Sequence, residues 1–477
     1  MDVQPSFSRD VLPVILVRGW GALDIQDEQR LTHQGFNIGT VYPHKTGPNY
    51  IYEGLILRFL KDRVHPYEDA TNVLRYSPGA GTMIDPDNPL VERFANVWNS
   101  LWVFRYYDFE HRDLKYYGEQ LAECIAYVKQ VTRAPQVNII AHSMGGLITR
   151  WMLQRVYGSK NEAHRHVNKV VTLGTPHGGI NFAHFADILP VGFELKYFSR
   201  NWLNKHLGGT RKKWSDISES FDPAGWLCVI GTNRWSYAVG SKYLTGKRSD
   251  GLVQQNNAKV DGAYTAYVHK CHGGRDSLVT SREAYELATR FLFGDNLVTI
   301  TRVNGRILGK YELFGSPEFY TGHSVKPRGV DFFLNQQCKA CENCEGAFRK
   351  NKLPAGRVVY RGFLDSAKIV AAAAEQDIAF RFDIYIGERD ILGQIGFSDT
   401  IVLDQQCVFK YEIDGQTLSL YPYMQSAGGE LGDVAEPDII KRKAKQIGPA
   451  RYEFGPFNVK YRTYEAEYVV HVENVGD

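Results

Sequence analysis

The sequence predicts two domains of different class: an α/β domain with a mostly parallel sheet flanked by helices, then a β-rich, sandwich-like domain. Three observations predict this division. The 477 residues are too many for one ordinary core. Short apolar runs alternate with helix-like stretches before residue 295, and β-type alternation dominates after it. We therefore place the first domain at 1–295 and the second at 296–477. Continuous apolar strands alternating with helices are typical of a parallel sheet covered on both faces.

The first domain contains six apolar runs that we interpret as strands, at residues 11–17, 101–106, 137–141, 167–173, 226–230 and 263–268. Apolar residues recur every three or four positions over 113–131, a helix opens at 145, and another covers 281–293. Two stretches, 32–97 and 176–224, are too long for ordinary βα connections. We predict that both are insertions above the carboxyl edge of the sheet, where lids lie.

The second domain alternates apolar and polar residues with a period of two. Its candidate strands cover 298–303, 357–363, 378–386, 400–403, 408–413, 417–420 and 464–472. No helical stretch matches those of the first domain. This pattern favours an antiparallel sandwich.

Composition excludes several classes of protein. Hydrophobic residues make up 43% and charged residues 23%, which is typical of a globular chain, and 56 basic against 53 acidic residues exclude a polybasic nucleic-acid binder as the default. No apolar run approaches the roughly 18–20 residues of a membrane-spanning helix. The first residues lack the basic and apolar regions of a secretory signal, so we expect a protein that is cytoplasmic as synthesised, or exported without a cleaved signal. Seven cysteines do not form a disulfide framework.

The most informative motif is Ala141-His142-Ser143-Met144-Gly145, which joins an expected strand directly to an expected helix. It matches the nucleophile elbow, Gly-x-Ser-x-Gly, with alanine in the first position. Small residues are needed two positions either side of the serine because the turn is tight. The motif predicts that Ser143 is a nucleophile above the sheet.

A serine hydroxyl needs a base to take its proton, and on this kind of fold an acid and then a histidine follow the serine in the chain. Asp250 and His272 lie in loops after the fifth and sixth expected strands. We assign His272 as the general base and Asp250 as the residue that orients it. Asp222 and Asp261 are alternative acids, and His269 is an alternative base.

The tetrahedral intermediate of acyl transfer needs two N–H donors. We predict the backbone N–H of Met144 as one donor. For the other we favour the N–H of Trp20, in the loop after the first strand, because Gly19 allows a sharp approach.

Four motifs occur in order: Ala-His-Ser-Met-Gly-Gly at 141–146, Gly-Thr-Pro-His-Gly-Gly at 174–179, Ser-Asp-Gly-Leu-Val at 249–253 and Cys-His-Gly at 271–273. Over residues 11–293 the chain thereby resembles the α/β-hydrolase lipases, and within them the branch related to GPI-inositol deacylases and bacterial lipases with the same elbow. The resemblance implies a Ser143, Asp250, His272 triad and hydrolysis of carboxylic esters through an acyl-enzyme. The chain departs from the family at Arg18, where a histidine is usual, and in its β-rich second half.

The substrate class is indicated by the insertion at 176–224. This insertion is rich in apolar and aromatic residues, and basic residues follow them. Together these residues cover 176–213. This pattern favours a lid over an acyl pocket, or contact with a membrane surface. The alternative is that these side chains fill the core of the insertion itself. We therefore predict a lipase or phospholipase, with an esterase or thioesterase for smaller acyl groups as the alternative.

Further hypotheses concern cofactors and partners. We expect no cofactor; Asp276 lies near His272, where some bacterial lipases hold calcium, but its spacing matches poorly. Cys338, Cys341 and Cys344 could begin a zinc site if Cys407 lay close, although a local disulfide or plain thiols fit better. A lipid-cleaving enzyme without a signal also resembles type VI secretion effectors, which would imply immunity or secretion proteins as partners. The remaining alternative is a catalytically inactive binding protein.

Overall fold

The computed structural model describes residues 9–19, 53–77, 81–83, 88–104, 106, 113–180, 195–236, 248–273, 276–308, 318–328, 330–337, 343–348, 352–372, 378–389, 400–412, 417–422 and 439–475. The chain divides into two compact units. The first comprises residues 1–266 with 270–293, and the second comprises 267–269 with 294–477.

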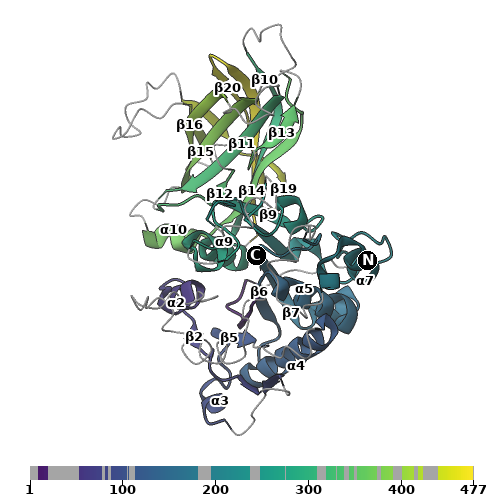
Figure 1. Cartoon of the computed structure of the whole chain (residues 1–477). Coiled ribbons are helices and arrows are strands. Elements are labelled where there is room, and N and C mark those ends of the chain that lie inside the picture. Colours follow the sequence, from purple (N-terminus) through teal and green to yellow (C-terminus); the bar gives the residue numbers. More distant parts are fainter. Residues whose placement is uncertain are drawn as a thin grey trace, which may run out of the picture. The chain divides into compact units, whose positions relative to one another are not determined.

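The first unit is built on a seven-stranded sheet in the order β2-β5-β1-β6-β7-β8-β9 (Figure 1). Its strands are β1 (Val14–Val17), β2 (Glu68–Asp69), β5 (Ser100–Phe104), β6 (Val137–His142), β7 (Val167–Leu173), β8 (Trp226–Gly231) and β9 (Tyr264–Val268). The pairs β2·β5, β5·β1, β1·β6, β6·β7 and β7·β8 are all parallel. Every residue of β1, β5, β6, β7 and β8 is buried. The predicted parallel α/β sheet is confirmed.

Helices connect and cover these strands. They are α2 (Glu53–Lys61), α3 (Leu90–Arg93), α4 (Leu114–Thr132), α5 (Met144–Trp151) with its π-helical continuation η1 (Met152–Tyr157), α6 (Lys160–His164), α7 (Arg200–Leu207) and α9 (Arg282–Phe293), with short 3-10 turns η3 (Leu195–Phe198), η4 (Pro223–Gly225), η5 (Gln255–Ala258) and η6 (Leu278–Thr280). Helix α4 contacts α5, and α2 contacts α9 (Figure 1). A two-stranded ribbon, β3 (Arg75–Ser77) with β4 (Gly81–Met83), lies within the first predicted insertion.

The first unit buries two cations against the carbonyl ends of helices. Lys169 on β7 is 5% exposed and donates to the carbonyl oxygens of Phe291 and Leu292, at 3.0 and 2.9 Å, at the end of α9. Arg150 on α5 is fully buried, and its Nη2 donates to the carbonyl oxygen of Leu207, the last residue of α7, at 2.9 Å. The C-terminal end of a helix carries a partial negative charge, so it suits a cation.

The second unit consists of two antiparallel sheets. One has the order β14-β10-β21-β20-β19, and the other has the order β12-β11-β15-β16-β17-β18 with β13 paired to β11. Their strands are β10 (Asn296–Ile307), β11 (Glu318–Pro327), β12 (Asn335–Gln336), β13 (Glu345–Phe348), β14 (Arg357–Leu364), β15 (Ile378–Arg389), β16 (Thr400–Glu412), β17 (Thr417–Tyr421), β18 (Ile440–Lys443), β19 (Lys445–Gly448), β20 (Arg451–Tyr461) and β21 (Tyr464–Asn474).

Aromatic rings pack these two sheets face to face. The ring of Phe409 on β16 lies 5.4 Å from that of Phe457 on β20, and Phe382 on β15 lies 5.6 Å from Tyr468 on β21, both edge to face. The prediction of a β-rich, sandwich-like domain is confirmed. Two details differ from it. Residues 400–412 form one strand rather than two, and a short helix, α10 (Ser366–Ala372), occurs where no helix was expected.

Candidate active site

The nucleophile elbow forms between β6 and α5, as the motif predicted. Ser143 has φ 50° and ψ −123°, a backbone conformation that L-residues rarely adopt. The turn is tight because Gly145 lies directly against β1: a Cβ on Gly145 would collide with the carbonyl oxygens of Val17 and Arg18. The Ser143 N–H donates to the carbonyl oxygen of Leu173 at 3.0 Å, which fixes the turn to the end of β7.

The structure brings the three predicted residues Ser143, Asp250 and His272 together. His272 Nε2 lies 2.9 Å from Ser143 Oγ, and His272 Nδ1 lies 2.8 Å from Asp250 Oδ2. All three side chains are buried, with exposed fractions of 6%, 1% and 3% for positions 143, 250 and 272. With Asp250 ionised, Nδ1–H donates to the carboxylate, and the lone pair of Nε2 accepts the serine proton.

Asp250 is held in place by its own loop. Its Oδ1 accepts the backbone N–H groups of Leu252 and Val253 at 2.9 and 2.7 Å, which leaves Oδ2 for the imidazole. The backbone N–H of His272 also donates to the carbonyl oxygen of Asp250 at 2.8 Å. The two residues are therefore joined through both main chain and side chain, which limits the rotation of the ring.

The alternative acids and base have other contacts. Asp222 Oδ1 accepts the Ala224 N–H at 2.9 Å and so begins η4. Asp261 Oδ2 pairs with Lys213 Nζ at 2.5 Å. His269 groups with the second unit.

Two glycines make room for Asp250 and His272, a role that was not predicted for them. A Cβ on Gly174, which has φ +56°, would lie 3.0 Å from Asp250 Oδ2 and 3.2 Å from His272 Nδ1. A Cβ on Gly231 would lie 2.6 Å from Asp250 Cβ. Gly174 opens the Gly-Thr-Pro-His-Gly-Gly motif, so that motif was the available signal.

His142, the last residue of β6, supports the loop that carries His272. It is 5% exposed, and its Nε2 lies 2.9 Å from the carbonyl oxygen of His272, so this nitrogen must carry the hydrogen. Burial and the neighbouring His272 lower the pKa of His142 well below its ordinary value, which keeps the ring neutral. His142 therefore acts as a donor that fixes the main chain of the histidine loop.

The predicted oxyanion donors have different outcomes. Met144 is the first residue of α5, so its N–H has no acceptor within the helix and points past the N-terminal end. Trp20 lies outside the described residues. Gly19, just before it, has no space for a side chain, since a Cβ would lie 2.6 Å from Ser143 Cβ. The end of β1 and Gly19 therefore lie very close to Ser143.

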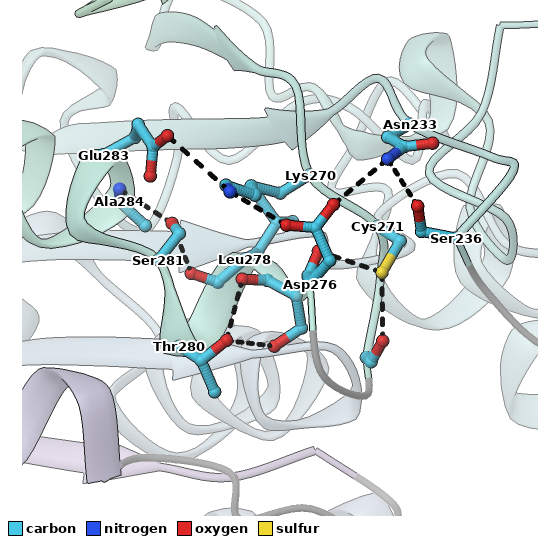
Figure 2. A network of polar contacts seen from close by, with 12 residues as sticks. Asn233, Ser236, Lys270, Cys271, Asp276, Leu278, Thr280, Ser281, Glu283 and Ala284 are labelled. Atoms are coloured by element: carbon cyan, nitrogen blue, oxygen red, sulfur yellow. Dashed lines mark hydrogen bonds and ion pairs between the residues drawn. The ribbon is translucent and has the colours of Figure 1, made fainter. Parts of the chain in front are cut away.

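An ion-pair network surrounds the loop that carries His272 (Figure 2). Lys270 Nζ lies 2.8 Å from Asp276 Oδ1 and 3.8 Å from Glu283 Oε1. Asn233 Nδ2 donates to Asp276 Oδ2 at 3.1 Å, which ties this loop to the loop after β8. The Cys271 N–H donates to the carbonyl oxygen of Asp276 at 3.0 Å and closes the base of the loop.

The residues considered as metal ligands have other surroundings. Both oxygens of Asp276 already accept hydrogen bonds, one of them from a cation. Across the described ranges, no group of three or more His, Cys, Asp or Glu side chains is arranged to hold a metal ion. Cys344 and Cys407 are buried, and Cys338 and Cys341 lie outside the described residues.

The second predicted insertion is described over 176–180 and 195–224. Tyr197, Phe198 and Leu203 are buried, so these side chains pack inside the first unit. The Trp202 ring stacks on Trp151 of α5 with centroids 5.8 Å apart. The other apolar residues of this insertion, 182–193, lie outside the described residues. Among the described helices, none is long and apolar enough to cross a membrane.

Comparisons with known proteins found similar sequences and structures. Residues 94–217 match the model of the PGAP1-like alpha/beta domain. A triacylglycerol lipase of Pseudarthrobacter phenanthrenivorans and one of Burkholderia plantarii are each 46% identical over 76 residues, which is 15% of this chain and 21% and 18% of theirs. The match thus spans about a fifth of the length of these relatives. The solved structure of phospholipase PlaB from Legionella pneumophila is similar at 13% identity, over 78% of this chain and 86% of that chain, with a TM-score of 0.34.

The parallel sheet with its nucleophile elbow defines an α/β-hydrolase. The match to the PGAP1-like alpha/beta domain over 94–217 and the short matches to the two lipases support a likeness to the lipases and esterases of that fold.

Proposed function

We propose that the chain is a serine hydrolase that cleaves carboxylic esters of lipids through an acyl-enzyme intermediate. The observation that carries this proposal is the continuous arrangement of Ser143 Oγ, His272 Nε2, His272 Nδ1 and Asp250 Oδ2, with separations of 2.9 and 2.8 Å. The lipid class is supported by the names of the two triacylglycerol lipases.

In the proposed reaction, Ser143 Oγ attacks the ester carbonyl carbon while His272 Nε2 takes its proton. Asp250 stabilises the imidazolium that forms. The oxyanion accepts the Met144 N–H, and a second donor comes from the loop after Gly19, where the sequence predicts Trp20. His272 then gives the proton to the leaving alcohol. A water molecule, activated by the same ring, releases the acid and restores Ser143.

Ser143→Ala is the direct test. We expect loss of at least about 10³-fold in kcat on p-nitrophenyl esters and phospholipids, and loss of labelling by a fluorophosphonate probe. Ser159→Ala is the matched control: Ser159 caps α6, away from the three residues, so activity and labelling should persist. Full activity of Ser143→Ala on every acyl ester would disprove the proposal.

The double variant Ser143→Ala, His272→Ala sharpens this test. Residues that act as one unit lose activity non-additively, so the double variant should be no slower than the worse single variant. Additive losses would show that the two side chains act separately.

The choice among lipase, phospholipase, esterase and thioesterase is a matter of substrate preference. A graded panel of p-nitrophenyl esters, phospholipids and acyl thioesters, with and without chelator, would rank these substrates and test calcium. The secreted-effector hypothesis stays a prediction, as do its immunity partners and membrane contact. Toxicity on periplasmic expression that requires Ser143 would support it, and harmless expression would contradict it.

A further inference from the structure

Arg302 is a cation buried in the interior of the second unit. It lies on β10, where apolar Ile300 and Ile307 share the inner face, and its exposed fraction is 0%. Its Nη2 reaches the carbonyl oxygen of Pro354 at 3.5 Å, the limit of a hydrogen bond. Its Nε and Nη1 have no hydrogen-bond partner in the part of the chain that the structure describes. Leaving buried charged donors unbonded is costly.

The buried carboxylates of the second unit bind elsewhere. Among the described residues of this unit they are Asp365 and Asp383. Asp365 Oδ1 accepts the Lys368 N–H at 3.2 Å at the start of α10. Asp383 binds the guanidinium of Arg381 through both oxygens, at 2.5 and 2.6 Å. The charge of Arg302 therefore has no counter-ion among them.

The polar groups around Arg302 are neutral. Tyr464 and Tyr468, on β21, share a hydrogen bond of 2.7 Å between their hydroxyls, and the Tyr468 hydroxyl lies 3.4 Å from His323 Nε2 on the facing sheet. Burial and the charge of Arg302 lower the pKa of His323 well below its ordinary value. Burial raises the pKa of both tyrosines, and the nearby guanidinium of Arg302, which also interacts with the Tyr464 hydroxyl, opposes this rise. The cluster thus carries one net positive charge inside a sandwich of aromatic rings.

The strand is shaped around this side chain. The pairing of β10 shifts register against β14 between Ile300 and Thr301, and against β21 between Arg302 and Asn304. Irregularities of this kind redirect a side chain. Gly305, which is paired with Ala466, leaves room for the arginine, since a Cβ there would lie 3.0 Å from Arg302 Cδ.

We propose that Arg302 binds one small monovalent anion, of the size of a halide, inside the second unit. The single uncompensated positive charge requires one negative charge, so a divalent phosphate would leave an excess. The two unbonded N–H groups supply donors, and a halide accepts donors from any direction. Burial would remove the water around the ion, and the attraction of the guanidinium, strengthened in the low-dielectric interior, together with its N–H donors would offset that cost.

The direct test is the anomalous scattering of bromide in crystals of the full chain. We expect a bromide peak within hydrogen-bond distance of the Arg302 guanidinium, and no peak there in Arg302→Met. Water alone at the guanidinium, with bromide and formate both tried, would overturn the proposal. A formate ion in place of bromide would support an anion site but assign it to a carboxylate.

A solution test uses the distribution of tryptophan. All eight tryptophans precede residue 236, so their fluorescence reports the first unit, while far-ultraviolet circular dichroism also reports the β-sheets of the second. Replacing bulky gluconate by chloride at constant ionic strength should raise the dichroism midpoint by about 5 °C and leave the fluorescence midpoint in place.

Variants assign this shift to the site. Arg302→Met should lose it. Arg306→Met is the matched control on the same strand, because Arg306 is exposed and pairs with Glu465 at 2.7 Å; it should keep the shift. Should Arg302→Met fail to fold, Arg302→Lys keeps a charge and should show a smaller shift. An equal shift in wild type and in a folded Arg302 variant would overturn the proposal.

Discussion

The two units treat a buried cation in different ways. In the first unit, Arg150 and Lys169 each reach the carbonyl oxygens at the end of a helix. Arg150 is also bonded to Gln154 and to the carbonyl oxygen of His177. In the second unit, Arg302 lies between sheets, whose carbonyl oxygens are already paired along the ladders, and two of its nitrogens are unbonded. The helix ends of the first unit thus supply acceptors for both buried cations, whereas the described part of the second unit supplies Arg302 with one distant carbonyl oxygen, that of Pro354, which is why we infer an external anion there.

Arg150→Met should have the largest effect on stability. It leaves the carbonyl oxygen of His177 and the side chain of Gln154 without their donor in a dry interior, so we expect a loss of about 3 kcal/mol in the free energy of unfolding. Urea unfolding followed by tryptophan fluorescence would measure it. In halide-free buffer, Arg302→Met should instead be neutral or stabilising by about 1 kcal/mol, since it removes an uncompensated charge; far-ultraviolet circular dichroism would follow this unfolding, because the tryptophans report the first unit. Equal losses in both variants would break the comparison.

Lys169→Met should change how stability depends on pH. Burial lowers the pKa of Lys169 from 10.5 to about 7. Between pH 7 and the ordinary lysine pKa, the unfolded chain holds a proton that the folded chain has lost, so this group makes stability rise with pH. Below pH 7 both states hold the proton, and the contribution is constant.

Lys169→Met should lack this rise of stability with pH. Relative to wild type, we expect Lys169→Met to lose about 1 kcal/mol in the free energy of unfolding per pH unit between pH 7.5 and 9. Urea unfolding at pH 6, 7.5 and 9 would measure the difference. A constant difference between wild type and variant would show that the helix-end carbonyls keep Lys169 charged throughout.

Asp276→Asn should show the smallest effect on stability. Asp276 and Lys270 are partly exposed, so water can replace their contact, and we expect a change below about 1 kcal/mol. Because the pair closes the His272 loop, kcat on esters should still fall by about tenfold while KM stays constant.

Asp261→Asn is the control for that change. It removes an exposed pair with Lys213 and should leave kcat unchanged. An unchanged kcat in Asp276→Asn would show that the backbone contacts of the loop alone position His272.

The nucleophile elbow was predictable because strand, turn and helix occupy consecutive residues. Each small residue of the motif is also required sterically by the tight turn. Asp250 and His272 followed from their order and their loops, although the contact of His272 with Ser143 joins positions 129 residues apart. Arg150 and Lys169 gave no local signal, since their acceptors lie 57 and up to 123 residues away.

Strand β16 shows a different limit of prediction. Polar residues Asp404, Gln405 and Gln406 interrupt its apolar pattern, so the sequence indicated two strands. The structure pairs all three residues with β15, which continues one strand through them. Whether such a segment forms a strand depends on backbone pairing with a neighbouring strand, and its own side-chain pattern does not reveal that pairing.

The bonds from Lys169 to the end of α9 set a boundary for dividing the protein. A fragment that ends before residue 291 would keep the buried Lys169 side chain but lack the two carbonyl oxygens that accept its hydrogen bonds. Limited proteolysis within α9 should therefore unfold the first unit, whereas cleavage after residue 293 would keep the hydrogen bonds between Lys169 and the end of α9.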